Sequence, residues 1–332
     1  FWFLLLTLLP IFTVIVITYF QRSESIKEET IQKLTAIRDL KVTMLTNWLE
    51  RRDSELSTLS LDKELQDLQR IHFPDLQSTE NQNILNTGRS ILNLYLWNYS
   101  EYYDFFVVDV ASKKIIVSTN MQMEGIDISY YEDLPINLTA KEISLSNIYY
   151  SRIISDYTMT YSVPIYSLVN NERVIKSVLF VDINLNNSLY KLLNNRVGLG
   201  ETGETLIVDK NVTALNQLRW YDNAPLNLQI VAEPAVKASK GKTGIASTND
   251  YRGIDVLAAY TYIPKMGWGF VCKQDWYELN LPIREMLKNF IIIFILLSIV
   301  VIILSLYITN SISKPIIDIV RVTKRIRSGD LS

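Results

Sequence analysis

The chain has 332 residues, of which 48% are hydrophobic and 20% are charged, and its formal net charge at pH 7 is −2. Its basic residues are scattered apart from one cluster beside an apolar segment, so the charge pattern gives no indication of nucleic-acid binding. The single cysteine, Cys272, excludes an internal disulfide framework, and a chain of this length can be stabilised by its hydrophobic core instead.

Residues 1–20 form an uncharged apolar segment that is long enough to cross a bilayer as a helix. The alternative is a secretory signal peptide, but its apolar core should be shorter and should be followed by a cleavage site of small residues. We therefore predict a first transmembrane helix at residues 1–20. Because the first residue is Phe1 and a helical pattern continues to the end, we expect the sequence to be part of a longer protein.

A long helix is predicted to follow the first span. No Gly or Pro occurs from Ile11 to Phe73, and leucines such as Leu45 and Leu49 recur at helical spacing with charges between them. This pattern predicts an amphipathic extracytoplasmic helix over residues 21–73 that ends at Pro74. A packing helix of the domain is compatible with the same pattern.

Short β-strands dominate the next part of the chain. A helix around residues 84–99 precedes them, and a helix at 187–195 follows. Strand patterns of β-branched and aromatic residues lie at 103–109, 114–118, 157–166 and 174–183. The order of strand, Asp and turn at Asp109 returns at Asp209, and later strands at 256–263 and 268–275 repeat the earlier order.

This repetition predicts an α+β protein with two small modules of helices and strands in tandem. The membrane-distal module is expected at residues 74–195 and the membrane-proximal module at residues 196–288. The two halves share the order of their elements but no clear residue identity.

A second apolar segment, Phe290 to Ile308, has 19 residues without a charge, Pro or Gly. As a helix it spans about 28 Å, close to the hydrocarbon thickness of a bilayer. A buried helix of a soluble protein is the alternative. We predict a transmembrane helix at 289–309, followed by a basic flank at 310–332, which is typical of the cytoplasmic side. The protein is thus expected to be a multi-pass protein of the cell membrane, with residues 21–288 outside the cytoplasm.

Several motifs resemble the double Cache family, in which two PAS-like modules follow a long N-terminal helix in prokaryotic sensor histidine kinases and chemoreceptors. The resemblance is carried by GLGETGET at residues 198–205, DYRG at 250–253 and GWG at 267–269. SKPI at 313–316 and SGDL at 328–331 resemble the opening of a HAMP linker. The resemblance covers the chain almost from end to end and implies a sensor that binds a small extracytoplasmic ligand.

In this family the distal module usually holds the ligand. The resemblance implies contacts from Tyr130, Tyr131, Tyr149, Arg152 and Asp182. Tyrosine rings can face apolar or cationic groups, an arginine can bind a carboxylate through two hydrogen bonds, and an aspartate can pair with an ammonium.

The class of ligand stays open between an organic acid, an amine and an amino acid. Amino-acid-binding members have an Arg shortly before the aromatic pair and an Asp two residues after a Tyr. Here Asp127 and Ile128 precede Tyr130, and Ser151 stands where that Asp would be.

Each candidate contact also has a structural explanation. With 19 tyrosines in the chain, any one of them can be a half-buried strand residue, and Asp182 can cap a helix or close a turn. The proximal module offers a second, less favoured set of contacts, which consists of Tyr251, Arg252, Tyr260 and Asp275.

No catalytic constellation, metal site or cofactor is predicted. His72 is the only histidine and is expected to be structural, and Cys272 lies in a strand pattern and is expected in the core. A membrane-anchored hydrolase is therefore the weaker hypothesis. For the missing output module, family frequency favours a histidine kinase, then a chemotaxis receptor, then a cyclic-dinucleotide enzyme. The apolar stripe that follows Lys314 predicts a homodimer, because such a stripe needs a partner helix.

Overall fold

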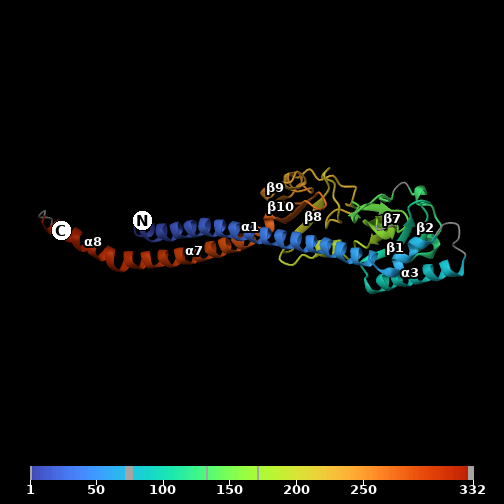
Figure 1. The fold of residues 1–332 in the computed structure, drawn as a ribbon. Helices are drawn as coiled ribbons and strands as arrows, with labels where there is room; N and C mark the ends of the chain where they lie inside the picture. The colour runs from blue at the N-terminus through green and yellow to red at the C-terminus, as the bar shows by residue number, and fades with distance from the viewer. Residues whose placement is uncertain (1, 72–77, 132–133, 170–171, 328–332) are drawn as a thin grey trace. The chain divides into compact units, whose positions relative to one another are not determined.

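The computed structural model describes residues 2–71, 78–131, 134–169 and 172–327 of the chain. Its backbone separates into two compact units: residues 33–275, and the two terminal segments 1–32 and 276–332. The larger unit contains every described strand, and the terminal unit is helical (Figure 1). The predicted α+β class is therefore confirmed.

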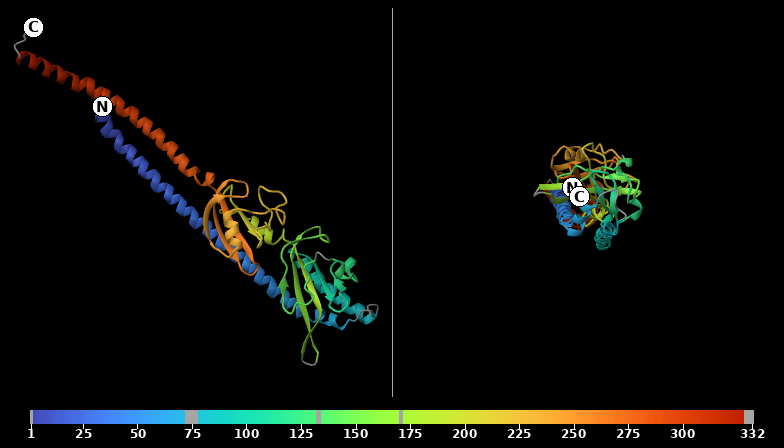
Figure 2. Two further views of the ribbon diagram at one scale, coloured as in Figure 1. Left: turned by 90° about the horizontal axis from the view of Figure 1, so that it is seen from above. Right: turned by 45° about the vertical axis from the view of Figure 1, so that its right-hand side comes forward.

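The N-terminal helix α1 runs without interruption from Trp2 to Ser60 (Figure 2). Within the larger unit its leucines form the buried stripe that the spacing predicts; the fully buried ones are Leu34, Leu45, Leu49, Leu56 and Leu59. The predicted end at Pro74 is wrong, because the helix stops at Ser60 and is followed by α2 (Lys63–Asp67) and η1 (Leu68–Arg70).

A local capping interaction explains this early end. Asp62 has an extended backbone and its carboxylate accepts a hydrogen bond from the amide of Glu64 at 3.1 Å, which starts a new helix. Because an Asp can cap a new helix without a neighbouring Gly or Pro, the absence of these two residue types does not predict that the helix continues. Pro74 and His72 lie outside the described residues.

The first sheet has five antiparallel strands in the order β2-β1-β7-β6-β3. Its strands are β1 (Tyr102–Asp109), β2 (Ile115–Ser118), β3 (Ser144–Leu145), β6 (Thr160–Val169) and β7 (Glu172–Ile183). The helices α3 (Thr79–Asn98) and α4 (Leu189–Asn194) flank it in the sequence, and the short helices η2 (Met121–Met123) and η3 (Ile128–Tyr130) lie in the connection after β2.

A separate two-stranded ribbon of β4 (Tyr149–Ser151) and β5 (Asp156–Thr158) precedes β6. The predicted strand at 157–166 is therefore two strands, because residues up to Thr158 pair with β4 and residues from Thr160 pair with β7. The local pattern of alternating residues is the same in both, so only the pairing partner separates them.

The second sheet has four antiparallel strands in the order β8-β11-β10-β9. They are β8 (Glu204–Val208), β9 (Gly244–Asn249), β10 (Asp255–Ile263) and β11 (Trp268–Asp275), and α5 (Glu233–Ser239) packs on β10 and β11. The arrangement β8-β11-β10 repeats β1-β7-β6 of the first sheet, in agreement with the repeated order seen in the sequence. The strand patterns missed α5 and β9.

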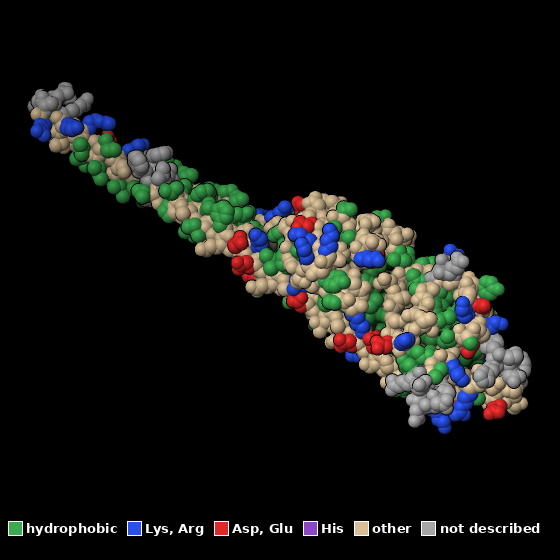
Figure 3. All heavy atoms as spheres, turned by 45° about the horizontal axis from the view of Figure 1, so that its top comes forward, with side chains coloured by type: hydrophobic (Ala, Val, Ile, Leu, Met, Phe, Trp, Pro, Cys, Tyr) green, Lys and Arg blue, Asp and Glu red, His purple; other side chains and the backbone are tan. Residues whose placement is uncertain are grey.

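The terminal unit contains α6 (Trp276–Leu279), α7 (Leu281–Ile308), a π-helical turn at Thr309–Ser313 and α8 (Lys314–Arg327). Within the part of the chain that the structure describes, one helical run, Trp276–Lys324, is long and apolar enough to cross a membrane. Hydrophobic side chains gather along this segment (Figure 3). Residues 2–20 are helical as the start of α1, and their membrane span stays a prediction.

Candidate functional site

Most of the predicted distal residues line one cavity of about 420 Å³. Its described lining residues are Tyr130, Tyr131, Leu134, Tyr149, Tyr150, Ser151, Arg152 and Ile153. Four of the five candidate contacts are among them, and Asp182 is not. The lining residues thus come from two parts of the chain, which are η3 with Tyr131 and Leu134 after it, and β4 with the turn that follows it.

Local contacts position both groups of lining residues. Asp127 caps η3 by accepting a hydrogen bond from the amide of Ser129 at 2.8 Å, and Tyr131 packs partly buried against the core of the first sheet. On the other wall the rings of Tyr150 and Tyr157 meet edge to face at 5.5 Å between centroids. The Asp127 that departs from the amino-acid-binding pattern therefore has a structural part in shaping the wall.

Asp182 lies behind the cavity wall and is linked to it through one threonine. Its carboxylate accepts a hydrogen bond from the Thr160 hydroxyl at 2.5 Å, and the same hydroxyl lies 2.6 Å from the Tyr149 hydroxyl. Asp182 is 4% exposed. Burial raises its pKa to about 7, although the Thr160 hydrogen bond opposes the shift and the negative charge of Asp104 adds to it.

Asp104 is a second buried carboxyl that the sequence analysis did not single out. It stands directly opposite Asp182 in the pairing of β1 with β7, and it accepts hydrogen bonds from the Thr119 hydroxyl and from the Phe105 amide. Burial raises its pKa as well. An acid on the apolar face of a strand, two residues before Phe106, is the signal that could have identified it.

These neighbours give Tyr149 an environment unlike that of an exposed tyrosine. Burial is the main reason that the pKa of Tyr149 is raised, and the negative charge of Asp182 adds to the shift. The Tyr149 hydroxyl therefore stays protonated and can donate a hydrogen bond, either to Thr160 or to a guest in the cavity.

Arg152 is the one cationic side chain among the described lining residues, and no acidic side chain is among them. Its side chain is exposed at the cavity, as is Tyr130, which is 84% exposed. The cavity therefore combines tyrosine rings with a guanidinium group, which suits a small molecule with a carboxylate and an apolar or flat part.

Most of the candidate contacts of the proximal module belong to an internal network of ion pairs around the second sheet. Buried Lys273 pairs with both Asp250 and Glu204, while Arg252 pairs with Asp250 at 2.7 Å and with Asp275 at 2.6 Å. The Tyr251 hydroxyl donates a hydrogen bond to the Glu204 carboxylate, and the Arg252 guanidinium lies 3.9 Å from the centre of the Trp220 ring. Tyr260 is buried in the adjacent hydrophobic core.

The cavity beside this network is only about 10 Å³. That volume is about what one water molecule requires. Arg252 and Asp275 are thus paired within this network, with Lys273, Asp250 and Glu204.

Cys272 is fully buried, and burial raises the pKa of its thiol to about 12. Among the described residues there is no group of three or more His, Cys, Asp or Glu side chains that could hold a metal ion.

Residues 22–283 match the family model of the Cache domain. The ligand-binding domain of the Campylobacter jejuni chemoreceptor Tlp3 in complex with 4-methylisoleucine is similar in structure, with 19% identity, a TM-score of 0.55, and coverage of 78% of this chain and 95% of that chain.

Two other solved structures are similar over nearly their whole length. The extracellular domain of the putative histidine kinase soHK1S-Z6 has 16% identity, a TM-score of 0.51, and coverage of 77% of this chain and 97% of that chain. The Pseudomonas aeruginosa PAO1 chemoreceptor PctC in complex with GABA has 14% identity, a TM-score of 0.50, and coverage of 74% and 100%. Among curated protein sequences the comparison finds no match.

Proposed function

The chain belongs to the Cache domain family, and on this premise we propose that it is the sensory region of a transmembrane receptor that binds a small carboxylate-bearing molecule outside the cytoplasm. The observation that carries the proposal is the 420 Å³ cavity in which Tyr130, Tyr131, Tyr149 and Arg152 come together. Its volume lies within the range that small-molecule sites have in proteins.

The side chains around the cavity have complementary tasks in this proposal. Arg152 binds the ligand carboxylate, and Tyr149 donates a hydrogen bond to a second polar group. The rings of Tyr130 and Tyr131 cover the apolar part of the ligand. Because Tyr130 is 84% exposed, it has room to move onto a bound guest.

An amino acid is the nearest alternative to a simple organic acid. Tlp3 and PctC were solved with 4-methylisoleucine and GABA, which each carry an ammonium group as well as a carboxylate. In this chain an ammonium group would have to reach Asp182 by displacing the Thr160 hydroxyl or by bonding through it. A simple carboxylate requires no such change.

Signal transfer in this proposal runs through the helices that leave the domain. Residues 1–20 and 289–309 span the membrane, residues 310–332 begin a HAMP linker in the cytoplasm, and two chains associate along the apolar stripe of α8. Ligand binding shifts the equilibrium between two helix arrangements only as far as its affinities for them differ, and about 1.4 kcal/mol of difference corresponds to a tenfold shift.

The output module beyond residue 332 is proposed to be a histidine kinase. A chemotaxis receptor and a cyclic-dinucleotide enzyme are the alternatives. A solved chemoreceptor domain and a solved domain of a putative histidine kinase both have this fold, so the fold does not discriminate between these two outputs.

A thermal-shift screen of the full chain in lipid nanodiscs tests the binding site. The panel consists of small mono- and dicarboxylic acids, amines, valine, isoleucine and GABA. A ligand at 100 times its dissociation constant stabilises the protein by about 2.7 kcal/mol, which produces a clear shift of the unfolding temperature.

Arg152→Ala should abolish the shift by a carboxylate, Tyr149→Phe should weaken it, and Arg51→Ala should leave it unchanged because Arg51 is an exposed arginine of α1. Binding that survives Arg152→Ala at full affinity would contradict the assignment of this cavity.

A further inference from the structure

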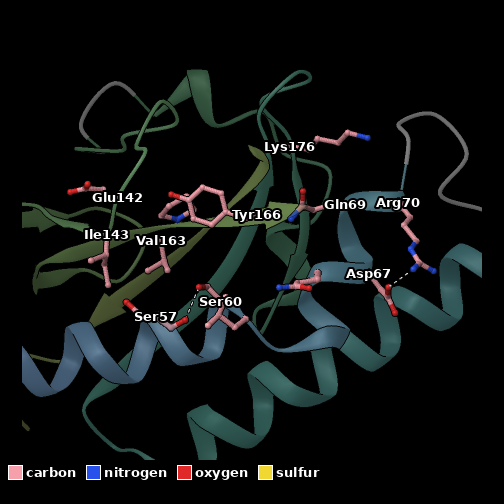
Figure 4. Close-up of a pocket in the computed structure, with 13 residues that line it drawn as sticks. Ser57, Ser60, Asp67, Gln69, Arg70, Glu142, Ile143, Val163, Tyr166 and Lys176 are labelled. Atoms are coloured by element: carbon pink, nitrogen blue, oxygen red, sulfur yellow. Dashed lines mark hydrogen bonds and ion pairs between the residues drawn. The ribbon is translucent and has the colours of Figure 1, made fainter. Parts of the chain in front are cut away.

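A second and larger cavity of about 790 Å³ lies in the same unit, between the end of α1, the segment α2–η1 and strand β6 (Figure 4). No residue that lines it lines the cavity of Tyr149 and Arg152. Its volume also falls in the range of small-molecule sites.

The large cavity contacts the face of β6 that is turned away from the Tyr149 cavity. Thr160 pairs with Asp182 and faces the Tyr149 side, so by the alternation of side chains along β6 Val163 faces the other side. Val163 is buried and lines the large cavity, toward which α1 contributes Ser57 and Ser60. Pro164, which shares the face of Thr160, also lines the large cavity, so the cavity extends around β6 beyond the residues that pair with β3.

Gln69 is the feature of this cavity that requires an explanation. It lies in η1, is 4% exposed, and neither its amide oxygen nor its amide nitrogen has a hydrogen-bond partner. In Figure 4 its side chain and that of Tyr166 project from opposite sides toward the same space. A buried amide without partners is costly, and nearly all such groups in proteins are satisfied by protein, water or a ligand.

The remaining lining indicates what kind of molecule fits. The charged lining residues balance in number, since Asp67 and Glu142 are acidic and Arg70 and Lys176 are basic, and Asp67 and Arg70 form an ion pair at 3.3 Å. The Ser60 hydroxyl donates to the Ser57 carbonyl at 2.8 Å, which leaves its oxygen able to accept a hydrogen bond. A net charge on the guest therefore gains nothing here.

Apolar surface completes the lining. The Tyr166 hydroxyl donates to the Lys141 carbonyl, which holds the aromatic ring in place, and Val163 and Pro164 add apolar area beside it. A guest must therefore have hydroxyl-type edges that both donate and accept, together with an apolar face.

We propose that this cavity is a second binding site, specific for a neutral sugar or polyol, in which the Gln69 amide exchanges hydrogen bonds with neighbouring hydroxyl groups and the Tyr166 ring lies against the apolar face of the guest. A planar amide offers an acceptor and two donors in one plane, which matches a pair of adjacent hydroxyl groups. This proposal is independent of the ligand of the Tyr149 cavity.

Thermal unfolding of the full chain in nanodiscs tests it, with D-glucose, D-galactose, sucrose and myo-inositol as probes. The probes are used at low millimolar concentration, because sugars at high concentration stabilise any protein by exclusion from its surface. At least one probe should raise the unfolding temperature in a saturable manner.

Three variants locate the binding. Gln69→Leu removes the amide and keeps a similar volume, and Ser57→Trp fills the cavity from an exposed position on α1. Each should weaken the apparent affinity at least tenfold, while Arg152→Ala should leave it unchanged. Since Ser57 lies outside the core, Ser57→Trp keeps the test valid if Gln69→Leu fails to fold.

Three results would overturn the proposal. The first is that none of the four probes raises the unfolding temperature in a saturable manner. The second is that a probe binds Gln69→Leu, or Ser57→Trp if Gln69→Leu does not fold, with the same affinity as the wild type. The third is that Arg152→Ala abolishes the rise in unfolding temperature. Failure of the carboxylate screen leaves these measurements unaffected, so the two proposals can be judged separately.

Discussion

The stability of this protein should depend on pH through Asp182, and the substitution Asp182→Asn should remove that dependence. The Asp182 carboxyl is buried and accepts a hydrogen bond from the Thr160 hydroxyl, which also contacts the Tyr149 hydroxyl. Asp104 is its partner residue across β1 and β7, and the pKa of Asp182 in the folded protein is about 7. In the unfolded chain an aspartate has a pKa of about 3.9.

The direction in which the free energy of unfolding changes with pH follows from proton binding in the folded and unfolded states. Well below pH 4 both states hold the proton, so the pH dependence from this carboxyl is absent there. Between about pH 4 and pH 7 the folded state keeps a proton that the unfolded state has lost, so stability falls as pH rises. The two pKa values differ by about three, and each pKa unit corresponds to about 1.36 kcal/mol, so the loss is about 4 kcal/mol by pH 8.

Asparagine at this position keeps the acceptor for Thr160 and cannot ionise. Asp182→Asn should therefore match the wild type near pH 4 and exceed its free energy of unfolding by about 4 kcal/mol at pH 8. Removal of the Asp182 charge also relieves Asp104, which acts in the same direction.

Urea unfolding of both proteins, followed by tryptophan fluorescence at several pH values, measures the difference. A difference between variant and wild type that stays constant from pH 4 to pH 8 would refute the burial of an ionisable carboxyl at Asp182.

Three further predictions concern packing and burial. Lys273→Met should lower the free energy of unfolding in urea by about 3–5 kcal/mol, because it leaves the buried carboxylates of Glu204 and Asp250 without their partner. Lys265→Met should lower it by about 1 kcal/mol or less, because the ion pair of Lys265 with Asp53 is partly exposed. Gly203→Ala should lower the unfolding temperature strongly, since the new Cβ would lie 2.0 Å from the Leu199 carbonyl oxygen; an unchanged unfolding temperature would contradict this close approach of the two backbone segments. Cys272 should resist iodoacetamide in the folded protein and react on unfolding, because burial raises its pKa to about 12; rapid native labelling, read by mass spectrometry, would contradict its burial.

The amino-acid sequence by itself determined the elements that rest on local patterns. The leucine stripe of α1, the strands around Asp109 and Asp209, and the apolar run of α7 all follow from the spacing of side chains along a helix or strand. Four of the five proposed ligand contacts also meet at one cavity, and it was the family resemblance that identified them. Their binding of a ligand stays a prediction.

Other features depend on which residues meet across the fold, and only the tertiary structure decided them. The register of β1 with β7 sets Asp104 opposite Asp182, and the packing of η1 buries the Gln69 amide beside a cavity. The same is true of Lys273, whose partner Glu204 lies far away in the sequence. A period along the chain is encoded by neighbouring residues, whereas these contacts join distant segments whose pairing is set by the burial of whole faces.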